Sequence, residues 1–167
     1  MDRRLFLTRT LVAGAAVFVL PAETEGQAMT SSLVDRFAAT LSALDITAFA
    51  ALFSDEYVNH QMSAATGPPI PNGKSAKQNS VDFFAARLAG MPDLSVTVET
   101  SLITPDKVAA SFVYTGTHGG TYFGVAPTGR RLHFTSCDIF RVKDGLLAEH
   151  WGMGDIAGIL AQLRGTA

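Results

Sequence analysis

The sequence predicts an α+β fold in which N-terminal helices cover one face of a single curved antiparallel sheet. Apolar residues recur with helical spacing along the first part of the chain, and from Leu94 onward the alternation changes to every second residue. A length of 167 residues with 47% hydrophobic content suits one domain that buries a sizeable core. Helices followed by a run of strands with short turns are typical of this fold class.

Residues 1–28 are predicted to be an export signal and not part of the fold. The arginine pair in "RRLFL" precedes the apolar run 11–20, which ends at Pro21 and is too short to span a bilayer comfortably. This spacing resembles a twin-arginine export signal. The expected mature protein is a single domain, 29–167, that lies in the periplasm or outside the cell without a membrane anchor. The alternative is a cytoplasmic protein whose translation starts at Met29.

The first helical region is segment 30–53. Its apolar side chains recur every three or four residues, which is typical of an amphipathic helix. Ser31 or Ser32 can cap its start, and Asp45 is expected to cap a second, short helix after a bend. Segment 54–61 leaves the helix and is predicted to be irregular.

A loop and a further helix come next. Segment 66–74 contains three prolines and two glycines, which predicts a loop. Segment 75–94 is predicted to be a helix that Gly90 and Pro92 close.

Four strands with period-two alternation follow, and the chain ends in a short amphipathic helix. Hairpin turns are expected at Asp106-Lys107 and at 143–145. Asp155 is expected to cap the last helix, 155–163. The predicted strands are 94–103, 107–118, 130–142 and 146–152.

Composition excludes several classes of protein. The formal charge is −2 and no run of lysine and arginine marks a nucleic-acid surface. Cys137 is the only cysteine, which rules out an internal disulfide and zinc sites built on paired cysteines. We expect neither a metal nor a cofactor, although a metal site assembled from distant residues stays open. The histidines show no H-x-x-x-H spacing; they are His60, His118, His133 and His150.

Asp138 is the most informative polar residue. Strand alternation places it on the same face as Phe134 and Phe140, which is the predicted buried face. An ionised carboxylate there is costly unless it is paired, and desolvation raises the pKa of a carboxyl group toward the range of an acid or base near neutral pH. The alternative is a structural aspartate that bonds a neighbouring hydroxyl or backbone amide.

His150 is expected to lie beside Asp138. In segment 146–152 the alternation assigns Leu146, Ala148, His150 and Gly152 to one face, and Leu147, Glu149 and Trp151 to the other. The hairpin at 143–145 brings this strand next to 130–142.

Other polar and aromatic residues converge on the same region. His118 ends strand 107–118 on the parity of Phe112 and Tyr114, while Asn59 and His60 come from the irregular segment, where binding residues often lie. Such convergence predicts a pocket for a small apolar or carbonyl-containing molecule. The expected catalytic residues are Asp138 and His150, and the expected binding residues are Asn59, His60, His118, Tyr114, Phe134, Phe140 and Trp151, with Phe112 in the apolar wall.

Several motifs resemble those of SnoaL-like polyketide cyclases, in the branch known as ester cyclases. The motifs G-x-x-P-T-G-R-R, I-F-R-V-x-D-G and E-H-W occur in order, and the resemblance covers residues 31–164. It implies the nuclear transport factor 2-like fold, a cone whose curved sheet surrounds a deep pocket and which commonly pairs as a homodimer through the sheet. It also implies an intramolecular aldol cyclisation without metal or cofactor.

The resemblance breaks at the acid/base position. The family aspartate on the last strand falls on Gly152, and the neighbouring family histidine falls on Asp138, whereas Asn59 and His118 match. A glycine at 152 would leave room for a ligand of different shape. The acid/base pair has therefore moved, or the pocket does something else.

The resulting expectation is an enzyme that performs acid/base chemistry on a small carbonyl or polyketide-type substrate. Asp138 would take the proton, and His150 or Asn59 would hold the enolate oxygen. One alternative is a non-catalytic protein of the same fold that binds a small molecule. Another is a hydrolase in which Asp138 activates water.

Overall fold

The computed structural model describes residues 33–61 and 73–166. The predicted export signal at 1–28, the caps Ser31 and Ser32, and most of the loop predicted at 66–74 lie outside these described residues.

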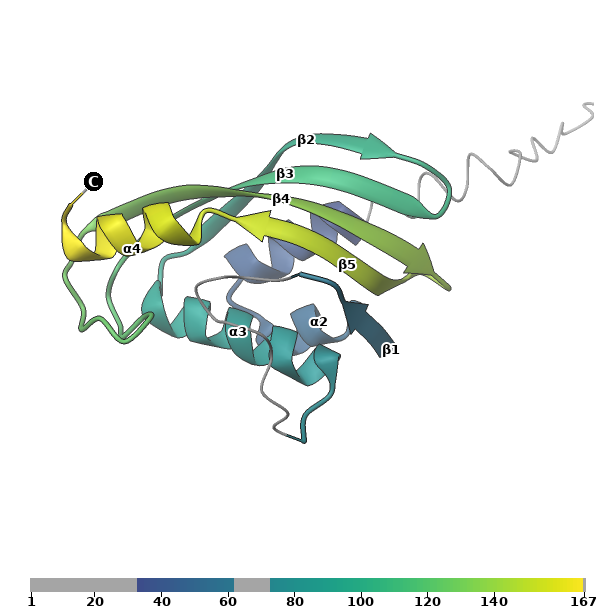
Figure 1. Ribbon diagram of the computed structural model, residues 1–167, viewed down its shortest axis with the longest axis horizontal. Helices are drawn as coiled ribbons and strands as arrows, with labels where there is room; N and C mark the ends of the chain where they lie inside the picture. Colours follow the sequence, from purple (N-terminus) through teal and green to yellow (C-terminus); the bar gives the residue numbers. More distant parts are fainter. Residues whose placement is uncertain (1–32, 62–72, 167) are drawn as a thin grey trace, which may run out of the picture.

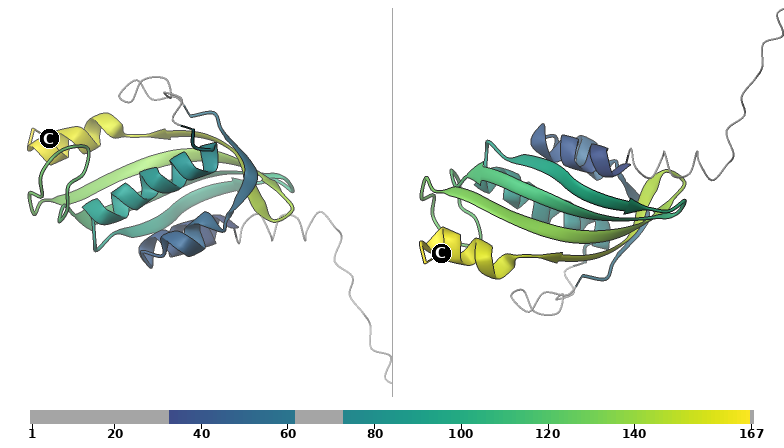
Figure 2. Two further views of the ribbon diagram at one scale, coloured as in Figure 1. Left: turned by 90° about the horizontal axis from the view of Figure 1, so that it is seen from below. Right: turned by 90° about the horizontal axis from the view of Figure 1, so that it is seen from above.

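Helices pack against one face of a curved five-stranded sheet, which confirms the predicted α+β class (Figure 1). The strands lie in the order β1-β5-β4-β3-β2. Helix α3 runs across the concave face, as the view from below shows (Figure 2). The strands are β1 (Phe53–Asn59), β2 (Ser95–Ile103), β3 (Lys107–Thr117), β4 (Arg131–Lys143) and β5 (Leu146–Gly154). The helices are the segment 33–42, α2 (Ile46–Ala50), α3 (Ala76–Gly90) and α4 (Ile156–Arg164).

Local sequence signals set the helix ends. Asp45 caps α2 by accepting a hydrogen bond from the Ala48 amide, and Asp155 caps α4 in the same way, as predicted. Ser75 and Gln78 form a capping box at the start of α3. The Ser75 side chain accepts a hydrogen bond from the Gln78 backbone N–H, and the Gln78 side chain accepts one from the Ser75 backbone N–H. Within the described ranges, no helix is long and apolar enough to cross a membrane.

Strand β1 corrects two predictions, because segment 54–61 is not irregular and the sheet is not wholly antiparallel. β1 forms the edge of the sheet and pairs in parallel with β5. Only Phe53 and Tyr57 are buried along it, so the two-residue alternation of a strand is weak. Backbone hydrogen bonds to a distant part of the chain hold it, for example from His60 N to His150 O at 2.7 Å.

A β-bulge in β5 corrects the predicted faces of this strand. Glu149 lies opposite Arg141 and Leu147 lies opposite Val142, so Ala148 is an extra residue between the two pairs. The bulge shifts the alternation by one residue. Simple alternation predicts that Leu147 shares the outer face with Glu149. Because of the bulge, Leu147 instead points inward and is fully buried.

Phe37 lies at the centre of the core. Its ring contacts those of Phe49 and Phe84 from the helical layer, and those of Phe112 and Phe140 from β3 and β4, with centroid distances of 5.0 to 5.5 Å. Segment 33–42 is thereby joined to the concave face of the sheet.

Candidate active site

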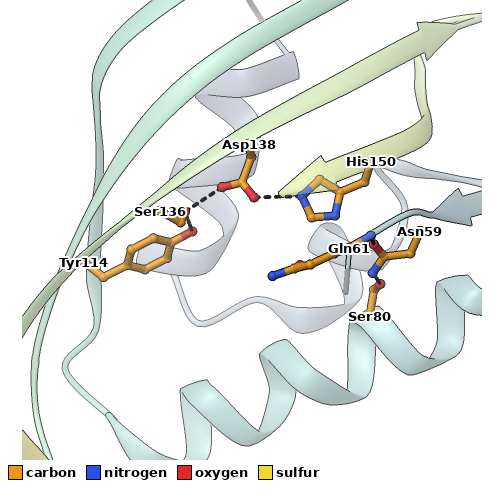
Figure 3. A network of polar contacts seen from close by, with 7 residues as sticks. All are labelled: Asn59, Gln61, Ser80, Tyr114, Ser136, Asp138 and His150. Carbon is orange, nitrogen blue, oxygen red and sulfur yellow. Dashed lines mark hydrogen bonds and ion pairs between the residues drawn. The ribbon is translucent and has the colours of Figure 1, made fainter. Parts of the chain in front are cut away.

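Asp138 and His150 form a buried pair on the inner face of the sheet. Nε2 of His150 donates a hydrogen bond to Oδ1 of Asp138 at 2.7 Å, and the two residues are only 6% and 7% exposed. The pair faces α3 in the close view (Figure 3). The shared face predicted from strand alternation is therefore present, and the strands β4 and β5 position both side chains.

Gly152 is what permits this pair. It lies directly opposite Asp138 in the β4–β5 register. A Cβ at 152 would lie 2.2 Å from Oδ1 of Asp138 and 2.4 Å from Nε2 of His150. The space expected to accept a differently shaped ligand is thus occupied by the pair itself, and a side chain at 152 would force the pair to shift.

Ser136 and Tyr114 extend the network along the sheet. Oγ of Ser136 donates to Oδ2 of Asp138 at 2.5 Å and lies 3.4 Å from the Tyr114 hydroxyl. Because a serine hydroxyl has a single hydrogen, the Tyr114 hydroxyl must supply the proton of the longer contact. Burial raises the pKa of Tyr114 to about 12, so this phenol stays protonated as a donor.

Asn59 and Gln61 approach from β1. Nδ2 of Asn59 donates to Oγ of Ser80 on α3 at 3.2 Å, and its Oδ1 accepts from the backbone N–H of Gln61 at 2.9 Å. Asn59 is the register partner of His150. Figure 3 shows the Gln61 side chain directed toward the Tyr114 side of the site.

Sequence reasoning missed three of these residues. Ser136 shares the parity of Asp138, and that signal was sufficient to find it. Gln61 follows Asn59 and His60 directly, but β1 itself was not predicted. Ser80 has no signal in the sequence, because only the packing of α3 brings it to Asn59.

The predicted aromatic wall is largely present. Phe140 stacks on the His150 ring at 4.8 Å with an interplanar angle of 15°, and Tyr114 stacks on Phe134 at 5.0 Å. Phe112 is fully buried on the same strand face as Tyr114.

His118 is not joined to the network. It is fully buried, and its Nδ1 accepts from the Thr128 amide at 3.3 Å and lies 2.9 Å from the Thr128 hydroxyl. These contacts connect the end of β3 to the loop that precedes β4. The structure therefore gives His118 a partner in that loop and does not bring it to Asp138.

His60 and Trp151 lie on the opposite face of the sheet, so the structure does not bring these two predicted binding residues to the site. Their rings stack at 4.5 Å with an interplanar angle of 7°. Nε2 of His60 contacts Oε2 of Glu149 at 2.8 Å, and Glu149 also pairs with Arg141. Glu149 and Trp151 flank His150 in β5, so their side chains point away from it. The expected homodimer through this face stays a prediction.

This outer cluster predicts a pH dependence of stability. Hydrogen bonds from His60 and then Arg141 lower the pKa of Glu149 from its ordinary value of 4.5. A depressed carboxyl pKa stabilises the fold above the unfolded-state pKa, and this contribution is lost as the pH falls through the folded-state value. We expect Glu149→Gln to lose less stability than the natural protein when the pH falls from about 7 to about 3. Urea unfolding at both pH values measures this, with the exposed Glu56→Gln as control; equal losses would contradict it.

No cluster of three or more histidine, cysteine, aspartate or glutamate side chains in the described ranges could hold a metal ion.

Comparisons with known proteins agree with the fold. The family model of SnoaL-like polyketide cyclases matches residues 31–163. The structure of TsrD from Streptomyces laurentii is similar, with 26% identity, a TM-score of 0.70 and coverage of 84% of this chain and 98% of that one. A search of curated proteins gave no match.

Two further solved structures are similar. IdmH from Streptomyces antibioticus, a candidate polyketide cyclase, is 29% identical with a TM-score of 0.66, over 81% of this chain and 98% of that one. AclR from Streptomyces galilaeus, a candidate hydroxylase, is 24% identical with a TM-score of 0.69, over 83% of each chain. With most of its length matched by the family model, the chain belongs to the SnoaL-like polyketide cyclase family.

Proposed function

We propose that this protein is a cyclase-type enzyme that transfers protons on a small carbonyl or polyketide-type substrate, with the Asp138–His150 pair as its acid/base unit. The observation that carries the proposal is the buried hydrogen bond between the two side chains at 2.7 Å. Family membership supports the cyclase class. Buried and mutually bonded titratable groups are typical of acid/base sites.

The geometry favours His150, and not Asp138, as the proton acceptor. Both carboxylate oxygens of Asp138 already accept hydrogen bonds, from His150 and from Ser136. With Nε2 of His150 donating to Asp138, the lone pair of the neutral ring lies on Nδ1. Among the described residues Nδ1 has no hydrogen-bond partner. Asp138 would hold the ring and stabilise the imidazolium, which reverses the roles expected from the sequence.

The proposed reaction is an intramolecular aldol addition. Nδ1 of His150 removes a proton from a carbon beside a carbonyl group, which leaves an enolate. The enolate carbon then attacks a second carbonyl carbon, a C–C bond forms, and the resulting alkoxide oxygen takes the proton back from the imidazolium. The side-chain amide of Gln61, which points toward the Tyr114 side of the site, would donate to the enolate oxygen (Figure 3).

The first step can be tested without knowing the natural substrate. Enzyme-catalysed exchange of α-protons for deuterium is followed by NMR across a panel that contains both aromatic β-ketoesters and aromatic keto acids. We expect His150→Ala to lower the exchange rate roughly 10²–10⁴-fold, because the general base is gone. Asp138→Asn should lower it less, since the ring keeps its basic nitrogen but loses its orienting carboxylate.

If Asp138→Asn abolishes the exchange and His150→Ala has only a small effect, Asp138 and not His150 is the general base. Matched controls are His133→Ala on the outer face of β4 and Asp106→Asn in the β2–β3 turn, which should leave the rate unchanged. Tight binding of panel members without any exchange would contradict the catalytic proposal and favour a binding protein. Incorporation of ¹⁸O from water into the acid formed from an ester, or into the diol formed from an epoxide, would favour the hydrolase.

A further inference from the structure

Arg87 on α3 is a buried cation on the inner face of the molecule. The residue is only 4% exposed, although arginine is among the residue types that are almost never fully buried without a partner. Nothing in the helical pattern of 75–94 marks this position, and no role follows for it from the acid/base pair.

Aromatic rings surround its guanidinium group. The Cζ atom lies 4.7 Å from the centroid of Tyr114, and the rings of three phenylalanines lie at 4.9 to 5.2 Å. Cation–π contacts of this kind offset part of the cost of desolvation. The phenylalanines are Phe83, Phe84 and Phe134.

The described residues provide no carboxylate ion pair for this charge. Nε of Arg87 donates a hydrogen bond to the hydroxyl of Tyr122 at 3.0 Å. Arg87 also makes a side-chain hydrogen bond to Tyr114, and the charge of Asp138 acts on it without forming an ion pair. A guanidinium has five N–H donors, so donors remain for which the described residues provide no partner. A buried charge of this kind is stabilised when an anion with complementary geometry binds to it.

The cation and the acid/base pair belong to one site. Tyr114 contacts Arg87 through its ring and Ser136 through its hydroxyl, and Ser136 donates to Asp138. Arg87 therefore lies at the Tyr114 end of the network and His150 at the other end. An extended substrate could place an anionic group at the first end and its acidic carbon at the second.

We propose that Arg87 binds a carboxylate of the substrate, so that the substrate class is aromatic or polyketide-type keto acids and not neutral esters. The planar guanidinium can accept a carboxylate through two parallel hydrogen bonds, and the surrounding rings suit an aromatic body beside that carboxylate. This inference rests on the proposed function, because only that function makes the bound anion part of a substrate. Its test measures binding alone, so it can fail or succeed independently of catalysis.

The test compares 2-naphthoate with its neutral methyl ester by isothermal titration calorimetry. We expect the full chain to bind the carboxylate at least about tenfold more tightly than the ester, because a hydrogen-bonded charge pair forms in a desolvated place. Arg87→Met keeps the length and apolar packing of the side chain but removes the charge, and it should abolish the preference. Arg87→Lys should retain part of it, and the exposed Arg36→Met, the matched control, should retain all of it.

Equal affinity for the two ligands in the natural protein, or an unchanged preference in Arg87→Met, would overturn the proposal. If Arg87→Met does not fold, an NMR measurement on the natural protein still tests the proposal. The Nε–H resonance of Arg87 should shift with naphthoate and not with the ester, and the absence of that difference would overturn the proposal. Naphthoate selectivity together with a failed exchange assay would retain the anion site and reject only the catalysis.

Discussion

Gly152→Ala is expected to separate Asp138 from His150 and to remove most of the activity. The added Cβ would lie 2.2 Å from Oδ1 of Asp138 and 2.4 Å from Nε2 of His150, far inside van der Waals contact. Both atoms are side-chain ends that can shift, and because the added Cβ would lie close to the two atoms that share the hydrogen bond, we expect the shift to break that bond. We expect a loss of proton exchange of roughly 10²–10⁴-fold, similar to the loss of the general base itself.

A matched control lies two residues further along the same strand. A Cβ at Gly154 would meet its nearest neighbours at 3.9 and 4.0 Å, which is ordinary contact. Gly154→Ala should therefore keep full activity. The imidazole ¹⁵N resonances of His150 provide a readout other than rate, and they should change in Gly152→Ala alone. Normal exchange and unchanged resonances in Gly152→Ala would show that the pair does not carry the chemistry.

Phe37→Ala is expected to have the largest effect on stability. The ring is 2% exposed and lies 5.0 Å from Phe112 on the sheet and 5.0 Å from Phe49 on α2. Its removal leaves a cavity between the helices and the sheet and deletes aromatic contacts from both layers. Comparable substitutions lower the free energy of unfolding by roughly 3–5 kcal/mol.

Urea unfolding of Phe37→Ala and of a surface control measures this difference. Leu102 is 77% exposed at the sheet surface, so Leu102→Ala should change the free energy of unfolding by less than about 0.5 kcal/mol. A loss of under about 1 kcal/mol in Phe37→Ala would mean that the helical segment 33–42 contributes little to the core.

The sequence by itself determined the elements whose signals are local. Helix α3 begins at its serine cap because capping acts within one turn, and it ends at Gly90 because Pro92 disfavours a helical conformation at Met91. The alternation in β4 placed Asp138 on the buried face, since successive strand side chains point to opposite faces whatever the neighbouring strand is. The resemblance in the motifs from β3 to β5 identified the family that the comparisons confirm.

Tertiary structure alone decided the features that depend on pairing between distant segments. β1 forms because β5 offers it a free edge, and the bulge at Ala148 resets which residues of β5 face inward. That register places His60 with Trp151 on the outer face, and it sets Gly152 opposite Asp138 so that the buried pair can form. The burial of Arg87 follows from how α3 packs across the sheet. Strand register and layer packing are non-local, so periodicity within one segment contains no information about them.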